Sequence, residues 1–177
     1  GNREQQDDTY DGSKPNEDDY RRARLSAFVQ MTYLGSPMIY YGDEVGVWGS
    51  DDPNNRKPFP WADQSPYEDD GFMIMPAHLD FYKRAIALRN DHVALRRGEF
   101  QTIQVHDDND TWAFTRTHGD ERVLVAINAS EKDAEIDLSD IEGNWVLVFS
   151  EPADSNVSGP PTITLPPLGA AVWRHQP

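Results

Sequence analysis

Ser36-Pro-Met-Ile-Tyr-Tyr-Gly-Asp-Glu-Val-Gly46 is an apolar run that stops at a glycine followed by two carboxylates. A loop rich in Pro, Asn and Trp follows, and it contains Asp52-Pro-Asn-Asn-Arg56. The pattern predicts a buried strand, Met38 to Tyr41, that delivers polar groups to a site at its end. This stretch therefore decides the fold and indicates where function is to be sought.

The residues on either side of this strand predict helices. One helix begins at about Asp18, carries apolar residues at three- and four-residue spacing and is closed by Gly35. A second runs from about Ala77 to Arg96, with Pro76 in its first turn and Gly98 as its stop. Helix, short turn and apolar strand make half of an alternating α/β pattern.

Two segments without periodicity are predicted as loops. The chain up to about Glu17 has almost no apolar content. Val45 to about Pro76 forms a long loop, which in a compact domain is usually functional or disordered. Trp48 and Trp61 argue against disorder.

After Gly98 the sequence changes to short β-rich segments separated by turn residues, which predicts an antiparallel β-sandwich. The segments are Phe100–Val105, Thr111–Thr117, Arg122–Asn128, Ala134–Leu138, Trp145–Ser150, Thr162–Leu165 and Ala170–Arg174. The chain thus divides into residues 1–98 and residues 99–177.

The first of these parts is incomplete by itself. A strand that is apolar on both faces belongs in a parallel sheet covered by helices, yet only one such strand is present. Alone it would expose two unpaired edges. We infer that residues 1–98 close a larger parallel α/β domain whose other strands are not in this chain.

Composition excludes several classes of function. The net charge of −15 disfavours nucleic acid and anionic membranes as partners. The absence of cysteine excludes disulfides and thiolate metal sites. No apolar run approaches bilayer length and residues 1–8 lack the apolar core of a signal peptide, but the compartment stays open because a signal could have been removed.

The motifs closely resemble the α-amylase family of glycoside hydrolases (family 13), in particular the neopullulanase, cyclomaltodextrinase and maltogenic amylase branch. The matching stretches are Gly35 to Glu44, Asp52 to Arg56 with Trp61, and Leu79 to Arg89 with Ala94 to Gly98. The resemblance implies the closing strand, rim loop and last helices of a (β/α)8 TIM barrel, followed by the C-terminal β-domain.

The resemblance also implies retaining hydrolysis of α-glucosidic bonds by an aspartate nucleophile and a glutamate acid/base, helped by a third aspartate. These residues come from earlier barrel strands, so no catalytic residue is expected here and the chain alone is expected to be inactive. His106-Asp107 is not the family's His-Asp pair, because it leads into a hairpin turn, Asp108 to Asp110.

Asp52 and Arg56 are the foremost substrate-binding candidates. In the branch that this chain resembles, the matching aspartate and arginine bind sugar hydroxyls. A carboxylate accepts from hydroxyls and a guanidinium donates to them, both more strongly than neutral groups do. The alternative is an Asp-Pro turn closed by a local ion pair.

Asp43, Glu44 and Trp48 complete the candidate site. Adjacent carboxylates at a strand end diverge unless the chain bends, so they are not the pair about 5 Å apart that retaining glycosidases need. One is expected to line the barrel top and the other to fix the loop, and either could contact the outer part of the site. Trp48 could stack on a pyranose ring or pin the loop, and for Phe59 and Trp61 pinning is favoured.

No metal or cofactor site is predicted. Asp107-Asp-Asn-Asp-Thr lacks the glycine of a calcium loop at its sixth position, and its twelfth position is His118 instead of glutamate. The five histidines show no paired ligand spacing, and there is no Ser-His-Asp or Gly-rich phosphate motif.

Two main hypotheses follow. In the first, the chain is the C-terminal part of an α-glucan hydrolase, whose partners are an α-glucan oligosaccharide and the remaining N-terminal part of the barrel. In the second, it is a stand-alone carbohydrate-binding or structural module. The incomplete barrel favours the first, within which a glucosyltransferase or isomerase of the same family stays open, as do the preferred glucan and the oligomeric state.

Overall fold

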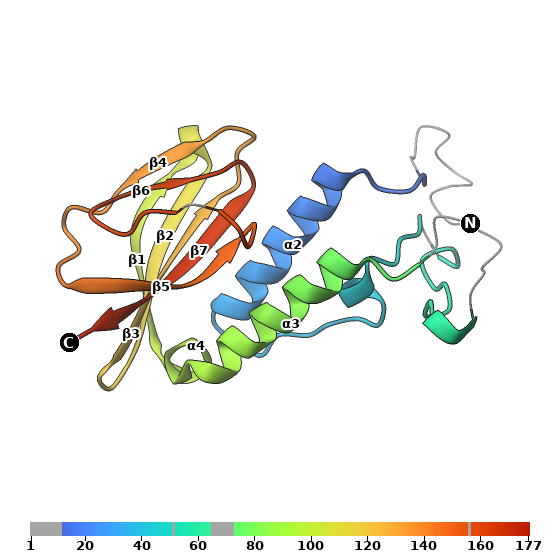
Figure 1. The fold of residues 1–177 in the computed structure, drawn as a ribbon, viewed down its shortest axis with the longest axis horizontal. Coiled ribbons are helices and arrows are strands. Elements are labelled where there is room, and N and C mark those ends of the chain that lie inside the picture. Colours follow the sequence, from blue (N-terminus) through green and yellow to red (C-terminus); the bar gives the residue numbers. More distant parts are fainter. Residues whose placement is uncertain (1–11, 51, 65–72, 156) are drawn as a thin grey trace.

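The structure is a computed structural model that describes residues 12–50, 52–64, 73–155 and 157–177; the predicted loop positions 1–11, 51 and 65–72 lie outside the described residues. Helices gather at one end and strands at the other (Figure 1). The elements are α2 (Glu17–Thr32), η1 (Asp43–Val45), η2 (Ala62–Gln64), α3 (Pro76–Asp91), α4 (Val93–Arg97), β1 (Glu99–His106), η3 (Asp107–Asn109), β2 (Thr111–His118), β3 (Glu121–Asn128), β4 (Ala134–Asp137), β5 (Asn144–Glu151), β6 (Thr162–Leu165) and β7 (Gly169–Gln176).

Both predicted helices are present and both begin with local signals. Asn16 caps α2 through a capping box, in which Asn16 and Asp19 each accept from the other's backbone N–H at 3.0 Å. Pro76 occupies the first turn of α3, as predicted. No helix in the described ranges is long and apolar enough to cross a membrane.

The second helix was predicted as one element to Arg96, but the structure breaks it at His92 into α3 and α4. Glu121, at the start of β3, holds the break. Its carboxylate lies 2.8 Å from Nδ1 of His92 and accepts from the backbone N–H of Ala94 at 2.7 Å. A carboxylate from another element thus caps the first turn of α4.

The buried strand predicted from Met38 to Tyr41 is not present in this structure, because residues 36–40 form neither helix nor strand. Met38 and Tyr40 are 74% and 52% exposed. A strand is stabilised by hydrogen bonds to a neighbour, and no other strand of the described part pairs with this segment. The segment returns as extended chain between the end of α2 and η1 (Figure 1).

The predicted antiparallel β-sandwich is confirmed, with strand ends moved by one or two residues. The larger sheet has the order β1-β2-β3-β7-β5, and β4 pairs with β6 in a second sheet. All neighbours are antiparallel. The last strand of the chain, β7, therefore lies inside the larger sheet, and β1 and β5 form its edges.

Both faces of the larger sheet are buried at its centre. Along β3, Val123 and Val125 belong to the cluster shared with the helices, whereas Leu124 and Ala126 belong to the cluster shared with β4 and β6. This alternation follows from the two-residue period of a strand. The sequence had not indicated that helices cover the second face.

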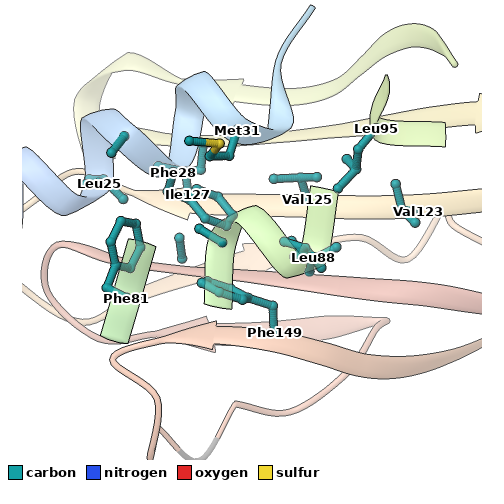
Figure 2. Close-up of a cluster of buried hydrophobic side chains, with 14 of the residues drawn as sticks. Leu25, Phe28, Met31, Phe81, Leu88, Leu95, Val123, Val125, Ile127 and Phe149 are labelled. Atoms are coloured by element: carbon teal, nitrogen blue, oxygen red, sulfur yellow. The ribbon is translucent and has the colours of Figure 1, made fainter. Parts of the chain in front are cut away.

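Aromatic rings join the helices to the sheet (Figure 2). Phe28 of α2 and Phe81 of α3 are fully buried, and their ring centroids lie 5.5 Å and 6.3 Å from that of Phe149 on β5. Burying such rings supplies much of the stabilisation of a core. The helices and the β-sheet therefore share one hydrophobic core.

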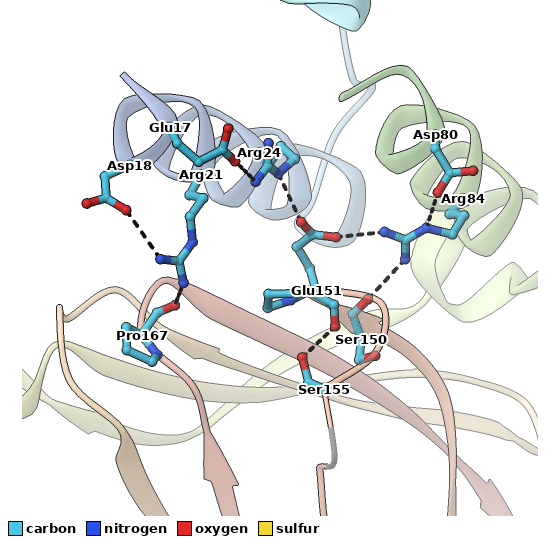
Figure 3. A network of polar contacts seen from close by, with 11 residues as sticks. Glu17, Asp18, Arg21, Arg24, Asp80, Arg84, Ser150, Glu151, Ser155 and Pro167 are labelled. Atoms are coloured by element: carbon cyan, nitrogen blue, oxygen red, sulfur yellow. Dashed lines mark hydrogen bonds and ion pairs between the residues drawn. The ribbon is translucent and has the colours of Figure 1, made fainter. Parts of the chain in front are cut away.

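A charged network lies beside this core (Figure 3). Glu151, at the end of β5, lies 2.9 Å from Nε of Arg24 on α2 and 2.7 Å from Nη2 of Arg84 on α3. The same two arginines pair with Glu17 and Asp80, each at 2.9 Å. The network links three elements that are distant in sequence.

Two buried arginines cap the end of α2, whose own last turn has no basic residue. Arg89 of α3 donates to the carbonyl of Met31 at 2.7 Å. Arg116 of β2 donates to the carbonyls of Thr32 and Tyr33 at 2.8 Å and 3.0 Å. These cations complement the partial negative charge of the helix C-terminus.

Candidate functional site

The candidate site begins in a tight turn. η1 lies between Gly42 and Gly46, whose φ angles are +94° and +77°. The carbonyl of Gly42 accepts from the N–H groups of Val45 and Val47 at 3.1 Å and 3.0 Å. Glycine is favoured at both positions because left-handed backbone is strained for other residues. The chain therefore bends where the two carboxylates stand.

Both carboxylates accept hydrogen bonds from the backbone just before them. Asp43 accepts from the N–H of Tyr40 at 3.1 Å, and Glu44 accepts from the N–H of Gly42 at 2.9 Å. Burial raises the pKa of Asp43, the Tyr40 bond lowers it and the charge of Glu44 raises it. Both side chains thus hold the turn, whereas the sequence predicts that only one of the two carboxylates does so.

The same carboxylates affect a neighbouring phenol. Burial raises the pKa of Tyr82 to about 12, and the charges of Asp43 and Glu44 add to the rise because a phenolate would be repelled by them. The Tyr82 hydroxyl is therefore neutral at physiological pH.

Asp52 and Arg56 form an ion pair in which Nε and Oδ1 are 2.8 Å apart, with the arginine side chain 66% and the aspartate side chain 58% exposed. The N–H of Arg56 donates to the carbonyl of Pro53 at 3.0 Å, so a turn brings the pair together. A pair this exposed contributes less than about 1 kcal/mol to stability. Its polar atoms are positioned at the surface, where a hydroxylated ligand could reach them.

Trp48 supports the loop that carries this pair. Nζ of Lys57 lies 3.3 Å from the centroid of the Trp48 ring, a cation–π contact. The hydroxyl of Tyr41 donates to the carbonyl of Lys57 at 3.1 Å. A Cβ added to Gly49 would lie 2.2 Å from the carbonyl oxygen of Asn54. The loop is therefore closely folded on itself, with the ion-paired turn at its tip.

The remaining aromatic candidates lie after this tip. Phe59 is half-buried, and its ring centroid is 4.5 Å from that of Trp61. Trp61 is 56% exposed, so it covers Phe59 but is not itself a core residue.

His106 is the last residue of β1, and Asp107 lies in the connection between β1 and β2, as predicted. Asp107 starts η3, and Asp110, with φ of +50°, leads into β2. Within the described residues no group of three or more His, Cys, Asp or Glu could hold a metal ion. The site offers hydrogen-bonding and stacking groups for a polyhydroxylated ligand.

Sequence reasoning missed the residues that brace the site. Tyr41 and Lys57 hold the loop, and the hydroxyl of Tyr20 on α2 donates to the carbonyl of Gly46 at 2.9 Å. No local pattern links Tyr20 to a turn 26 residues later, since the contact exists only through helix packing.

A family model described as Maltogenic Amylase, C-terminal domain, matches residues 100–172. Cyclomaltodextrinase of Geobacillus thermopakistaniensis (strain MAS1) is 35% identical over 130 residues, which are 73% of this chain and 21% of that protein. Neopullulanase 2 of Thermoactinomyces vulgaris is 38% identical over 105 residues, which are 59% of this chain and 17% of that protein. The solved structure of an α-amylase from H. orenii matches with a TM-score of 0.74 and 25% identity, covering 90% of this chain and 36% of that one.

The chain thus spans 21% and 17% of the length of these two curated relatives. The family match covers the β-rich part, and the likeness to the solved structure covers 90% of the chain and so extends beyond that part. The chain belongs to the α-amylase family of glycoside hydrolases (family 13), as a C-terminal part in the neopullulanase, cyclomaltodextrinase and maltogenic amylase branch.

Proposed function

We propose that this chain is part of a retaining hydrolase of α-glucosidic bonds that acts on starch-type oligosaccharides or cyclodextrins. Residues 1–98 close its (β/α)8 barrel, and residues 99–177 form its C-terminal β-domain. The names of the two relatives, cyclomaltodextrinase and neopullulanase, support this substrate class.

The direction of the helices supports the barrel. α2 and α3 run in the same direction, and the extended chain that follows α2 runs back the opposite way before η1 (Figure 1). Consecutive helices of a barrel are related in this way. Met38, Tyr40 and Ile86 are 74%, 52% and 37% exposed. The remaining N-terminal part of the barrel would cover these apolar side chains, since a parallel strand is normally buried on both faces.

The observation that carries the substrate-binding role is the exposed ion pair of Asp52 and Arg56 at the tip of a braced loop. The carboxylate accepts from sugar hydroxyls and the guanidinium donates to them. Asp43 and Glu44 hold the turn from which the loop starts, and Trp48 contributes its ring to the same rim.

The carboxylates that break the bond belong, in this proposal, to strands outside the chain. Asp43 and Glu44 are engaged by backbone N–H groups. In a retaining reaction one carboxylate attacks the anomeric carbon and the other protonates the leaving oxygen. Water then releases the glycosyl-enzyme intermediate; a sugar acceptor at this step would make the protein a transferase.

The binding role is tested by Asp52→Ala and Arg56→Ala in the complete enzyme, with maltooligosaccharide affinity measured by calorimetry. Each variant should raise Kd by about tenfold or more, because hydrogen bonds to charged groups contribute roughly 1.5–3 kcal/mol. Asp18→Ala is the control, since it removes another local pair, in which the exposed Asp18 lies 3.3 Å from a half-buried Arg21. Unchanged affinity in both rim variants would reject the assignment.

Intact mass and a denaturing gel of the protein from its source test the larger assembly. A longer polypeptide, or a companion that supplies the other barrel strands, supports the proposal. A stable monomer of 20.1 kDa would favour a stand-alone module instead.

A further inference from the structure

Three aromatic rings lie beneath the η1 turn. Tyr20 of α2 and His78 and Tyr82 of α3 are 5%, 2% and 7% exposed. The His78 ring centroid is 5.5 Å from the centroid of each tyrosine ring. Together with Asp43 and Trp48 they line a cavity of about 430 Å³. The rings therefore form the floor on which the turn rests.

Two of these rings face the two ends of the turn. The hydroxyl of Tyr20 donates to the carbonyl of Gly46 at 2.9 Å in a buried hydrogen bond. The backbone of Asp43 lies close enough to the His78 imidazole to raise its pKa. Nδ1 of His78 is buried and has no partner within the described part of the chain, so Nε2 is the nitrogen available to this backbone. Tyr20 of α2 thus holds one end of the turn, and His78 of α3 faces the other end.

The turn has little freedom to move relative to these helices. The N–H of Met75 donates to the carbonyl of Val45 at 3.1 Å. A Cβ added to Gly46 would lie 2.6 Å from Sδ of Met75 and 3.3 Å from Cε1 of Tyr20. Close contacts of this kind transmit a displacement instead of absorbing it.

The sugar-binding loop starts directly from this turn. Val47 is in contact with Gly42, where an added Cβ would lie 2.9 Å from the Val47 Cβ. Trp48 follows, and the ammonium group of Lys57 lies against its ring. The position of the turn therefore sets the direction in which the loop leaves, and with it the position of the loop tip.

We propose that Tyr20 and His78 are positioning residues for the sugar-binding loop, holding the η1 turn so that Asp52 and Arg56 meet the sugar in one geometry. This inference rests on the proposed function, because the ligand of the loop is the sugar named there. The two residues act through the turn and do not touch the ligand. Fixing a binding loop in its bound geometry improves affinity by reducing the ordering that binding requires.

The donor groups distinguish this role from simple packing. A packing role needs only the shape of each ring, whereas positioning needs the Tyr20 hydroxyl and the His78 N–H. Burial, followed by the charge of Arg24, lowers the pKa of His78 to about 4, although the Asp43 bond and Glu17 oppose this shift. The imidazole is therefore neutral at pH 7 and keeps one N–H for the turn.

The test uses Tyr20→Phe and His78→Leu in the complete enzyme, with amide hydrogen exchange of residues 47–57 measured by mass spectrometry. Both variants should accelerate exchange and raise KM for a maltooligosaccharide by about twofold to tenfold, with kcat little changed, since one net hydrogen bond is lost. His78→Gln, which retains an N–H donor, should restore both values. Tyr82→Phe is the matched control, because no hydrogen bond joins its hydroxyl to the turn within the described residues.

The outcomes separate this inference from the proposed function. Unchanged exchange in Tyr20→Phe and His78→Leu, or equal acceleration in Tyr82→Phe, would overturn the positioning role. If these variants accelerate exchange while Asp52→Ala and Arg56→Ala leave affinity unchanged, the loop is positioned as inferred but does not bind the sugar. If Asp52→Ala and Arg56→Ala weaken binding while Tyr20→Phe and His78→Leu change neither exchange nor KM, the proposed sugar-binding role is supported and the positioning role is rejected.

Discussion

The carboxylate of Glu151 lies 2.9 Å from Nε of Arg24, and both side chains are less than a tenth exposed. Its second oxygen lies 2.7 Å from Arg84, so one buried carboxylate joins α2, α3 and the end of β5 (Figure 3). Desolvation offsets much of the attraction within a buried ion pair, yet removing one partner leaves a buried charge uncompensated. The network therefore makes the junction sensitive to loss of the shared carboxylate.

Glu151→Ala should lower the free energy of unfolding by about 3 kcal/mol or more, because it leaves two guanidinium groups without their common partner. Urea denaturation measures this loss. Glu131→Ala is the control, since it removes an exposed pair with Arg22 and should have an effect below about 1 kcal/mol. Equal losses in the two variants would contradict a stabilising role of the network.

Arg116→Met should destabilise the protein by about 3 kcal/mol, because carbonyls of Thr32, Tyr33 and Gly98 lose a buried donor. Arg116 is 1% exposed, and burial, followed by the charge of Arg89, lowers its pKa. Arg116→Lys should recover only part of the loss, since lysine lacks the planar fork. Arg97→Met, at an exposed position, should be nearly neutral, and thermal melting compares the three.

His78 should make stability depend on pH between about 6.5 and 4. Its folded pKa of about 4 lies below the ordinary value of 6.5, so the unfolded chain binds the proton first as pH falls. The contribution of neutral His78 to the free energy of unfolding is complete above pH 6.5. It is lost as the pH falls to about 4, and the total loss is on the order of 3 kcal/mol. Arg24 and Glu17 are the charged groups that act on the ring, and the backbone of Asp43 also faces it.

Comparison with His78→Gln isolates this contribution from the titrating carboxylates. Urea unfolding at pH 7, 5.5 and 4.5, chosen as roughly spanning the transition, should show the difference between the two proteins shrinking as pH falls. A difference that is constant over this range would show that His78 does not titrate as inferred.

Gly49→Ala should weaken maltooligosaccharide binding with little loss of global stability. The added Cβ would lie 2.2 Å from the carbonyl oxygen of Asn54, a backbone atom that cannot rotate away, so the loop tip must move. Gly159→Ala adds a Cβ with no neighbour closer than 3.7 Å and should change neither property. Calorimetric titration and melting of both variants give the comparison, and full affinity in Gly49→Ala would show that the loop adapts.

Local interactions explain what was predicted correctly. Asn16 and Asp19 cap α2 from three residues apart, and Pro76 starts α3. The strands follow from β-rich segments between turn residues. The ion pair of Asp52 and Arg56, which the sequence left open as the alternative to sugar binding, forms because a turn within the same five residues joins them. These features depend on neighbours along the chain and can be read from it.

Contacts between distant segments explain the features that were not predicted. Glu121 breaks the second helix at His92 from 29 residues away, and the end of α2 is capped from α3 and β2. Met38 to Tyr41 has the composition of a strand, but a strand also needs a partner with which to exchange hydrogen bonds.

The sequence by itself determined the family, the positions of the strands β1 to β7 and the residue types at the rim, because each depends on local pattern. The bonds by which Asp43 and Glu44 hold their turn are local, since they span three and two residues. Only the tertiary structure decided that Tyr20 of α2 holds Gly46 in this turn from 26 residues away. The physical reason is that hydrogen-bond partners of a bent backbone are supplied by whichever helices pack against it. The spacing of residues along the sequence does not predict that packing.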